Sequence, residues 1–116
     1  MIALNTAAIS ARREPKFEVG QVVRHRRYGY RGVVVALDKR CAASEQWYES
    51  NQTQPSRQQA WYHVLVHDTE HSTYAAEENL AELEPLQEVW HPWLSLFFDG
   101  FGGGRYLRND EPWPVS

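Results

Sequence analysis

The side chains with the clearest potential for chemistry lie close together between residues 24 and 31. Four arginines there can neutralise phosphates or other anionic groups, and two tyrosines can stack on a base or insert at a groove. A histidine lies among them. We therefore predict a DNA-binding or partner-binding site that consists of Arg24, His25, Arg26, Arg27, Tyr28, Tyr30 and Arg31.

The sequence places these side chains at the tip of a β-hairpin. Residues 21–25 have a β-rich pattern, and residues 33–37 form a strong β run. The short link between them contains Gly29. Two β-rich runs joined by a short link with a glycine are typical of a hairpin, so the cations and tyrosines are expected to project from a turn.

The second run of this hairpin is predicted to be a central strand. One face is expected to hold Val33, Val35 and Leu37, and the other face Val34 and Ala36. Both faces are apolar, and this is the pattern of a strand that is covered on both sides.

The rest of the chain predicts more β structure around a long loop. Short strands are expected at residues 60–67, 71–76 and 82–84, and a helical turn is expected at 77–80, before the last of them. Residues 39–60 are rich in Gln, Ser and Asn and predict a functional or mobile loop with a helical turn at 42–47. Trp47 and Tyr48 are expected to attach this loop to the body. Short strands around a small core favour a mainly β fold, a small SH3-like β-barrel over residues 17–85.

Two segments flank the predicted barrel. Residues 1–16 are expected to be a flexible arm, and residues 86–116 form an aromatic, Gly-rich extension. Each large apolar side chain gains roughly 1.5–3 kcal/mol on burial, so the extension should pack on the barrel or on a neighbour. A short helix is expected after Pro92, and the glycines at 100 and 102–104 predict a flexible loop without regular structure. The predicted protein-interface residues are Trp90, Trp93, Phe97 and Phe98.

The charge of the chain is unevenly distributed. The 116 residues suit one domain and carry a net charge of -3. Residues 1–40 have nine Lys or Arg against three acids, and residues 41–116 have three against twelve. This split indicates a polyanion-binding patch or self-association. An acidic chain overall argues against a dedicated, high-affinity nucleic-acid binder.

Cysteine content and hydropathy bear on the compartment. Cys41 is the single cysteine, which excludes an intramolecular disulfide and fits a reducing environment. No apolar run approaches the length that spans a bilayer. A cytoplasmic protein is expected.

The residues do not favour an enzyme. His63 and His67 fall on a predicted strand, where a spacing of four separates side chains by roughly 13 Å. His67 and His71 could face each other across a hairpin, but other metal ligands do not converge on them in the sequence. Cys41 lacks the surroundings of a nucleophile. We predict no catalytic site, no metal and no cofactor.

Several motifs, taken in order, resemble a known family. They are FEVGQVVRH at 17–25, GYRGVVV at 29–35 with Asp38, WYHVLV at 61–66 and YAAEENL at 74–80. As a set they are similar to the YccV-like, or hemimethylated-DNA-binding, domain, whose stand-alone bacterial members are the HspQ-like heat-shock proteins. The tail also resembles the extension after this domain in a subfamily of F-box proteins, through His91-Pro92, Phe97-Phe98, Gly100 and Arg105-Tyr106-Leu107.

The resemblance implies a fold and a set of functions. It implies an SH3-like barrel, binding to hemimethylated DNA and a stress-response role in regulated proteolysis, with Lon or Clp protease components as partners and a trimer as the oligomer. We expect first a non-enzymatic protease adaptor, with hemimethylated DNA binding as the alternative. On the residues alone, the hairpin arginines could instead be solvated or pair with the acidic half, with the tyrosines in the core.

Overall fold

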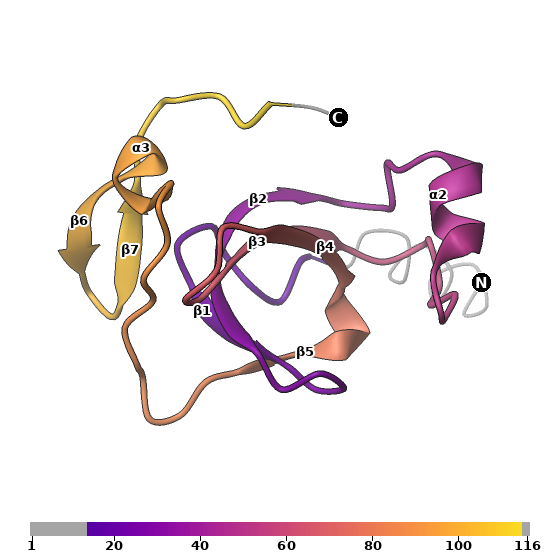
Figure 1. The fold of residues 1–116 in the computed structure, drawn as a ribbon, viewed down its shortest axis with the longest axis horizontal. Coiled ribbons are helices and arrows are strands. Elements are labelled where there is room, and N and C mark those ends of the chain that lie inside the picture. The colour runs from indigo at the N-terminus through magenta and orange to yellow at the C-terminus, as the bar shows by residue number, and fades with distance from the viewer. Residues whose placement is uncertain (1–13, 115–116) are drawn as a thin grey trace, which may run out of the picture.

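The protein has a mainly β fold (Figure 1). The computed structural model describes residues 14–114, so most of the predicted arm 1–16 lies outside the described residues. A five-stranded antiparallel sheet has the order β4-β3-β2-β1-β5, and a separate hairpin pairs β6 with β7. The strands are β1 (Val22–His25), β2 (Arg31–Asp38), β3 (Trp61–Val66), β4 (Ser72–Ala76), β5 (Leu80–Glu82), β6 (Phe98–Gly102) and β7 (Arg105–Arg108).

Three short helices complete the described chain. They are α2 (Glu45–Ser50), the 3-10 helix η1 (Glu77–Asn79) and α3 (Leu94–Phe97). In Figure 1, α2 lies at one end of the molecule, and α3 lies at the other end with the β6–β7 hairpin. None of these described helices has the length and apolar character needed to cross a bilayer.

The strand predictions hold for the main sheet. The β1–β2 and β3–β4 hairpins form, and β2 lies at the centre of the sheet. The last strand begins at Leu80 rather than at residue 82. Helix α2 begins at Glu45 because the Ser44 hydroxyl caps it, accepting the backbone N–H of Trp47 at 3.1 Å.

One hydrophobic cluster joins all five strands of the main sheet, which therefore curls around it. Its strand residues include Val23 of β1, Val34 of β2, Val64 of β3, Ala75 of β4 and Leu80 of β5. A flat sheet would keep the two edge strands apart. This inner cluster is the main core, and it fixes the strand ends from which the loops project.

A β-bulge in β2 overturns one expectation about its faces. Val34 pairs with Val64, but the next residue paired with β3 is Ala36, so Val35 is the extra residue. A shift of one residue reverses the side of the sheet to which later side chains point. Leu37 therefore packs against the inner cluster, and the prediction that it shares a face with Val35 was wrong.

The C-terminal extension covers the outer face of the sheet. A second cluster joins three of the strands to α3 and the β6–β7 hairpin; its buried members are Val22, Val33, Val35, Leu65, Val89, Phe97, Phe98 and Tyr106. The Tyr106 N–H donates to the carbonyl of Gly20 at 2.8 Å. A side chain at Gly20, which has φ of 95°, would collide with the Tyr106 backbone. The extension is thus a packed part of the fold.

The glycines of the extension form a hairpin turn. Gly102 pairs with Arg105, which leaves Gly103 and Gly104 as a two-residue loop. Both have positive φ, 64° and 84°, as a type I′ turn requires. The prediction of a flexible loop without regular structure was therefore wrong, because glycine here supplies the turn geometry that strand pairing needs.

Candidate nucleic-acid interface

The β1–β2 turn is built around His25. Its Nδ1 accepts the backbone N–H groups of Arg27 and Tyr28, both at 3.1 Å. The Gly29 N–H donates to the His25 carbonyl at 2.8 Å, and Gly29 has φ of 78°, which favours glycine. The hydrogen bonds to His25 therefore fix the geometry of a tight turn.

His25 and Tyr30 shape the turn and are largely covered. The His25 ring stacks between the rings of Tyr28 and Tyr30, with centroid distances of 4.7 and 5.0 Å. Burial, and then the charge of Arg27, lower the pKa of His25, which favours the neutral imidazole. The Tyr30 hydroxyl is 2.7 Å from Oγ1 of Thr73, and burial raises the pKa of that hydroxyl.

Four of the seven predicted site residues are exposed at or beside the tip: Arg24, Arg26, Arg27 and Tyr28. Within residues 14–114, the Arg26 guanidinium makes one hydrogen bond, in which Nε donates to the carbonyl of Leu80 at 3.2 Å. The Arg27 guanidinium lies 5.8 Å from the centre of the Tyr28 ring, and Tyr28 is 58% exposed. The tip thus presents cations next to an accessible aromatic ring.

Arg31 is half-buried and is held by the extension and the β3–β4 turn. Its Nε donates to the Glu88 carbonyl at 2.9 Å, and its Nη2 lies 2.9 Å from Nε2 of His67. Across residues 14–114, the charged contacts are Arg105–Glu18 and, when His63 is protonated, His63–Asp38. No described carboxylate therefore neutralises the hairpin arginines.

The four aromatic residues predicted as a protein interface divide into two pairs. Phe97 and Phe98 are buried in the outer cluster, where they hold the extension on the sheet. Trp90 and Trp93 are 57% and 42% exposed. Leu96 of α3, which the sequence analysis did not single out, is also exposed. Of the four predicted interface residues, only Trp90 and Trp93 are accessible to another molecule.

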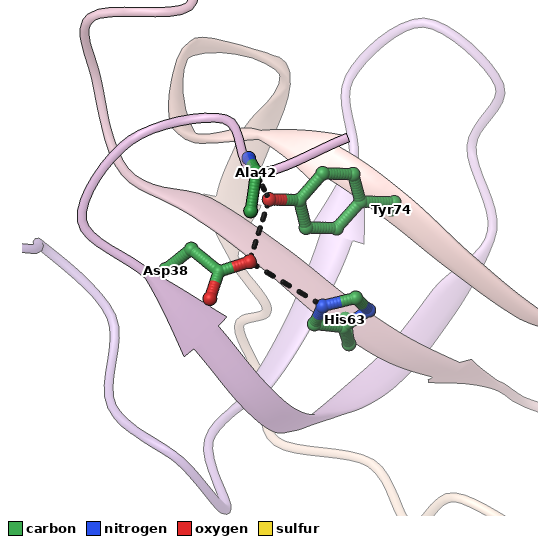
Figure 2. Close-up of polar contacts among 4 residues, drawn as sticks. All are labelled: Asp38, Ala42, His63 and Tyr74. Carbon is green, nitrogen blue, oxygen red and sulfur yellow. Dashed lines mark hydrogen bonds and ion pairs between the residues drawn. The ribbon is translucent and has the colours of Figure 1, made fainter. Parts of the chain in front are cut away.

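A polar network links Asp38, His63 and Tyr74 (Figure 2). The Tyr74 hydroxyl donates to Oδ2 of Asp38 at 2.6 Å and accepts the Ala42 N–H at 2.9 Å. Nε2 of His63 is 3.5 Å from the same carboxylate oxygen. Burial raises the pKa of Tyr74 and lowers the pKa of His63, although Asp38 opposes the second shift.

This network could orient a histidine base, but its geometry favours a structural role. The centre of the His63 ring lies 4.4 Å from the centre of the Tyr74 ring and 5.5 Å from that of Trp113. The network fixes the start of the segment 39–60 through Ala42. Sequence reasoning considered His63 only with His67, because the pairing of Asp38 with Tyr74 and His63 depends on the folded sheet. Within the described residues, no three His, Cys, Asp or Glu side chains are grouped so that they could hold a metal.

A family model described as hemimethylated DNA-binding protein YccV like matches residues 15–105. The chain belongs to the YccV-like family. The expected resemblance is thereby confirmed. The matched region includes the hairpin tip and continues into β7, so most of the extension lies within the YccV-like match.

The chain is also similar to F-box only protein 21 of mammals. It is 35% identical to the mouse protein over 102 residues and 34% identical to the human and Pongo abelii proteins over the same length. The match covers 85% of this chain and 16% of each relative. The YccV-like chain therefore spans about a sixth of the length of these relatives.

Proposed function

We propose that this YccV-like chain is a non-enzymatic module that binds DNA at the β1–β2 tip and prefers hemimethylated duplex. The family description supports this function more directly than the protease-adaptor role that the sequence analysis put first. The observation that carries it is the exposure of Arg24, Arg26 and Arg27 beside Tyr28, without a described carboxylate partner. The curled sheet would serve as a small SH3-like barrel that holds this tip.

The exposed arginines would supply most of the affinity. Each phosphate that they neutralise releases condensed counterions, a contribution that does not depend on sequence. Such contacts orient the protein on the duplex but do not read its bases. Preference for one methylation state therefore requires a second contact, between the protein and a base.

The test is a fluorescence anisotropy titration of one duplex in its unmethylated, hemimethylated and fully methylated forms. We expect the hemimethylated form to bind most tightly. The triple variant R24A/R26A/R27A should lose binding to all three forms, whereas K39A/R40A, which removes exposed cations outside the tip, should retain it. Equal affinity for the three forms, or no binding at low salt, would overturn the proposal.

An adaptor role is the second candidate, and the exposed tryptophans support it. Trp90 and Trp93 are large apolar side chains of the kind that anchor protein interfaces. A pull-down with Lon and Clp components, comparing the wild type with W90A/W93A, tests this role. The adaptor role is supported if the wild type is retained on these components and W90A/W93A is not. It is excluded if the wild type is not retained. Molar mass in solution tests the expected trimer.

A further inference from the structure

A small pocket lies beside the hairpin tip. It has a volume of about 80 Å³ and opens between the tip, the segment that follows α2, and β4 with η1. Aromatic rings line it, among them Tyr28 of the tip and Trp47 of α2. Three carboxamide side chains also line it: Asn51, Gln52 and Asn79.

The charge of the pocket limits the class of ligand. Arg27 is the cation among its lining residues, and no carboxylate lines it. A cationic ligand would meet Arg27 without a compensating anion. A neutral planar group attached to an anion fits better, because the ring can contact the aromatic walls and the anion can lie near Arg27. A nucleotide has this combination.

Two carboxamides have hydrogen-bonding groups left for a ligand. Gln52 accepts the Tyr28 hydroxyl at 3.3 Å through Oε1, and its Nε2 has no partner within residues 14–114. The side chain of Asn79 makes no hydrogen bond in the same region, although its backbone carbonyl accepts the Arg26 N–H at 2.8 Å. A free carboxamide can pair in a bidentate manner with N6 and N7 of adenine.

The size of the pocket sets how a base could enter. Pockets for whole small ligands have volumes of about 300–1,000 Å³, so this one admits only the edge of a base. The N6/N7 edge of a stacked adenine is exposed in the major groove, but a pocket recessed between three segments can enclose that edge only when the base swings out of the stack. The sugar and phosphate would then remain outside, near the exposed arginines of the tip.

We propose that this pocket receives the edge of an unstacked adenine, read by Asn79 and Gln52, while the tip arginines hold the strand. This inference rests on the proposed DNA binding and adds the base contact that methylation preference requires. Removing a base from the stack costs least when the base is already unpaired. The protein should therefore bind a duplex with an unpaired adenine about tenfold or more tightly than the paired duplex.

The experiment compares three duplexes by fluorescence anisotropy. The first is the hemimethylated duplex, and the second is the same duplex with the recognised adenine placed opposite an abasic site. In the third, that adenine itself is replaced by an abasic site. N79A and Q52A should reduce the preference for the unpaired adenine towards onefold. Their affinity for the duplex without the adenine should not change. Q58A is the matched control, since Gln58 is exposed and lies outside the pocket, and it should behave as wild type.

A second measurement does not depend on substitutions. In an NMR titration of the wild type with deoxyadenosine monophosphate, the amide signals of Asn79 and Gln52 should shift. Deoxyribose phosphate, which has no base, should not shift them.

The outcomes separate the two proposals. If the wild type binds duplex DNA but binds the hemimethylated duplex and its two abasic versions equally, or if N79A keeps the preference for the unpaired adenine, the base pocket is overturned and DNA binding stands. If the wild type binds none of the duplexes, the proposed function fails and this inference fails with it.

Discussion

The hairpin tip and the C-terminal extension carry the same kinds of side chain but use them differently. In the extension, Arg108 donates from Nε to the Val35 carbonyl at 2.8 Å and lies over the ring of Phe97. At the tip, Arg27 and Tyr28 are exposed, and no described carboxylate pairs with Arg27. Cations and aromatic rings are structural where the fold supplies their partners, and they are available to a ligand where it does not.

The extension has this structural role because of the sheet that it covers. The outer face of β2 presents Val33 and Val35, which would otherwise contact water. The bulge places Val35 outside the regular pairing with β3, and Arg108 supplies a donor for its carbonyl. Within the described residues, the Arg27 guanidinium at the tip donates to no backbone carbonyl in this way and lies beside the exposed ring of Tyr28.

The largest effect that tests this contrast is expected from F97A. Phe97 is 3% exposed in the outer cluster, and truncating a buried Phe typically costs about 3–5 kcal/mol of unfolding free energy. F101A is the matched control in the same extension, because Phe101 is half exposed. Urea unfolding should show a much larger loss for F97A, with DNA affinity of the folded protein unchanged. Equal losses would mean that the extension does not depend on its buried face.

A smaller loss of stability is expected from R108A. The substitution removes the donor to the Val35 carbonyl, and a buried polar group without a partner costs about 1–3 kcal/mol. R24A removes an exposed arginine and should change the free energy of unfolding by less than about 0.5 kcal/mol. Chemical denaturation of the two variants compares them directly. If both arginines contributed equally to stability, the distinction between the two regions would be lost.

The sequence predicted the main sheet well because its strands have a clear period. The two hairpins could be identified from apolar patterns and turn residues. The bulge at Val35 could not, since one extra residue leaves no mark in an all-apolar run, and Leu37 was therefore assigned to the wrong face. Gly103 and Gly104 were interpreted as a break although a two-residue glycine turn also fits a hairpin.

The residue types of the candidate sites could be predicted from the sequence, but which of these side chains are accessible to a ligand could not. Seven tip residues stood out as cationic or aromatic, yet the structural role of His25 depends on a turn that brings two N–H groups to its Nδ1. In the same way, the sequence marked Phe97 and Phe98 as apolar without showing that the sheet itself covers them. The pocket beside Asn79 joins segments that are far apart in the chain.

A smaller loss of unfolding free energy is expected when the pH is lowered. Because burial lowers the pKa of His25, the folded chain binds this proton less tightly than the unfolded chain. The stability from neutral His25 is therefore present above its ordinary pKa of 6.5 and is lost as the pH falls below that value towards the folded pKa. Protonation of Nδ1 would also remove the acceptor for the Arg27 and Tyr28 N–H groups.

Urea unfolding between pH 8 and pH 5 measures this effect. Burial also lowers the pKa of His63 and His91, so the wild type should lose stability as the pH falls. H25Q should lose less over the same range, because one of the three contributions is absent. An identical pH dependence of the two proteins would contradict the role of His25.

The measurement that tests the central claim most directly is the salt dependence of DNA binding. The logarithm of the binding constant falls with the logarithm of salt concentration by about 0.9 for each phosphate neutralised on duplex DNA. If Arg24, Arg26 and Arg27 each contact a phosphate, R24A/R26A/R27A should reduce the slope by about 2 to 3, while K39A/R40A should leave it as in the wild type. An unchanged slope in the triple variant would place the DNA contact elsewhere and contradict this account.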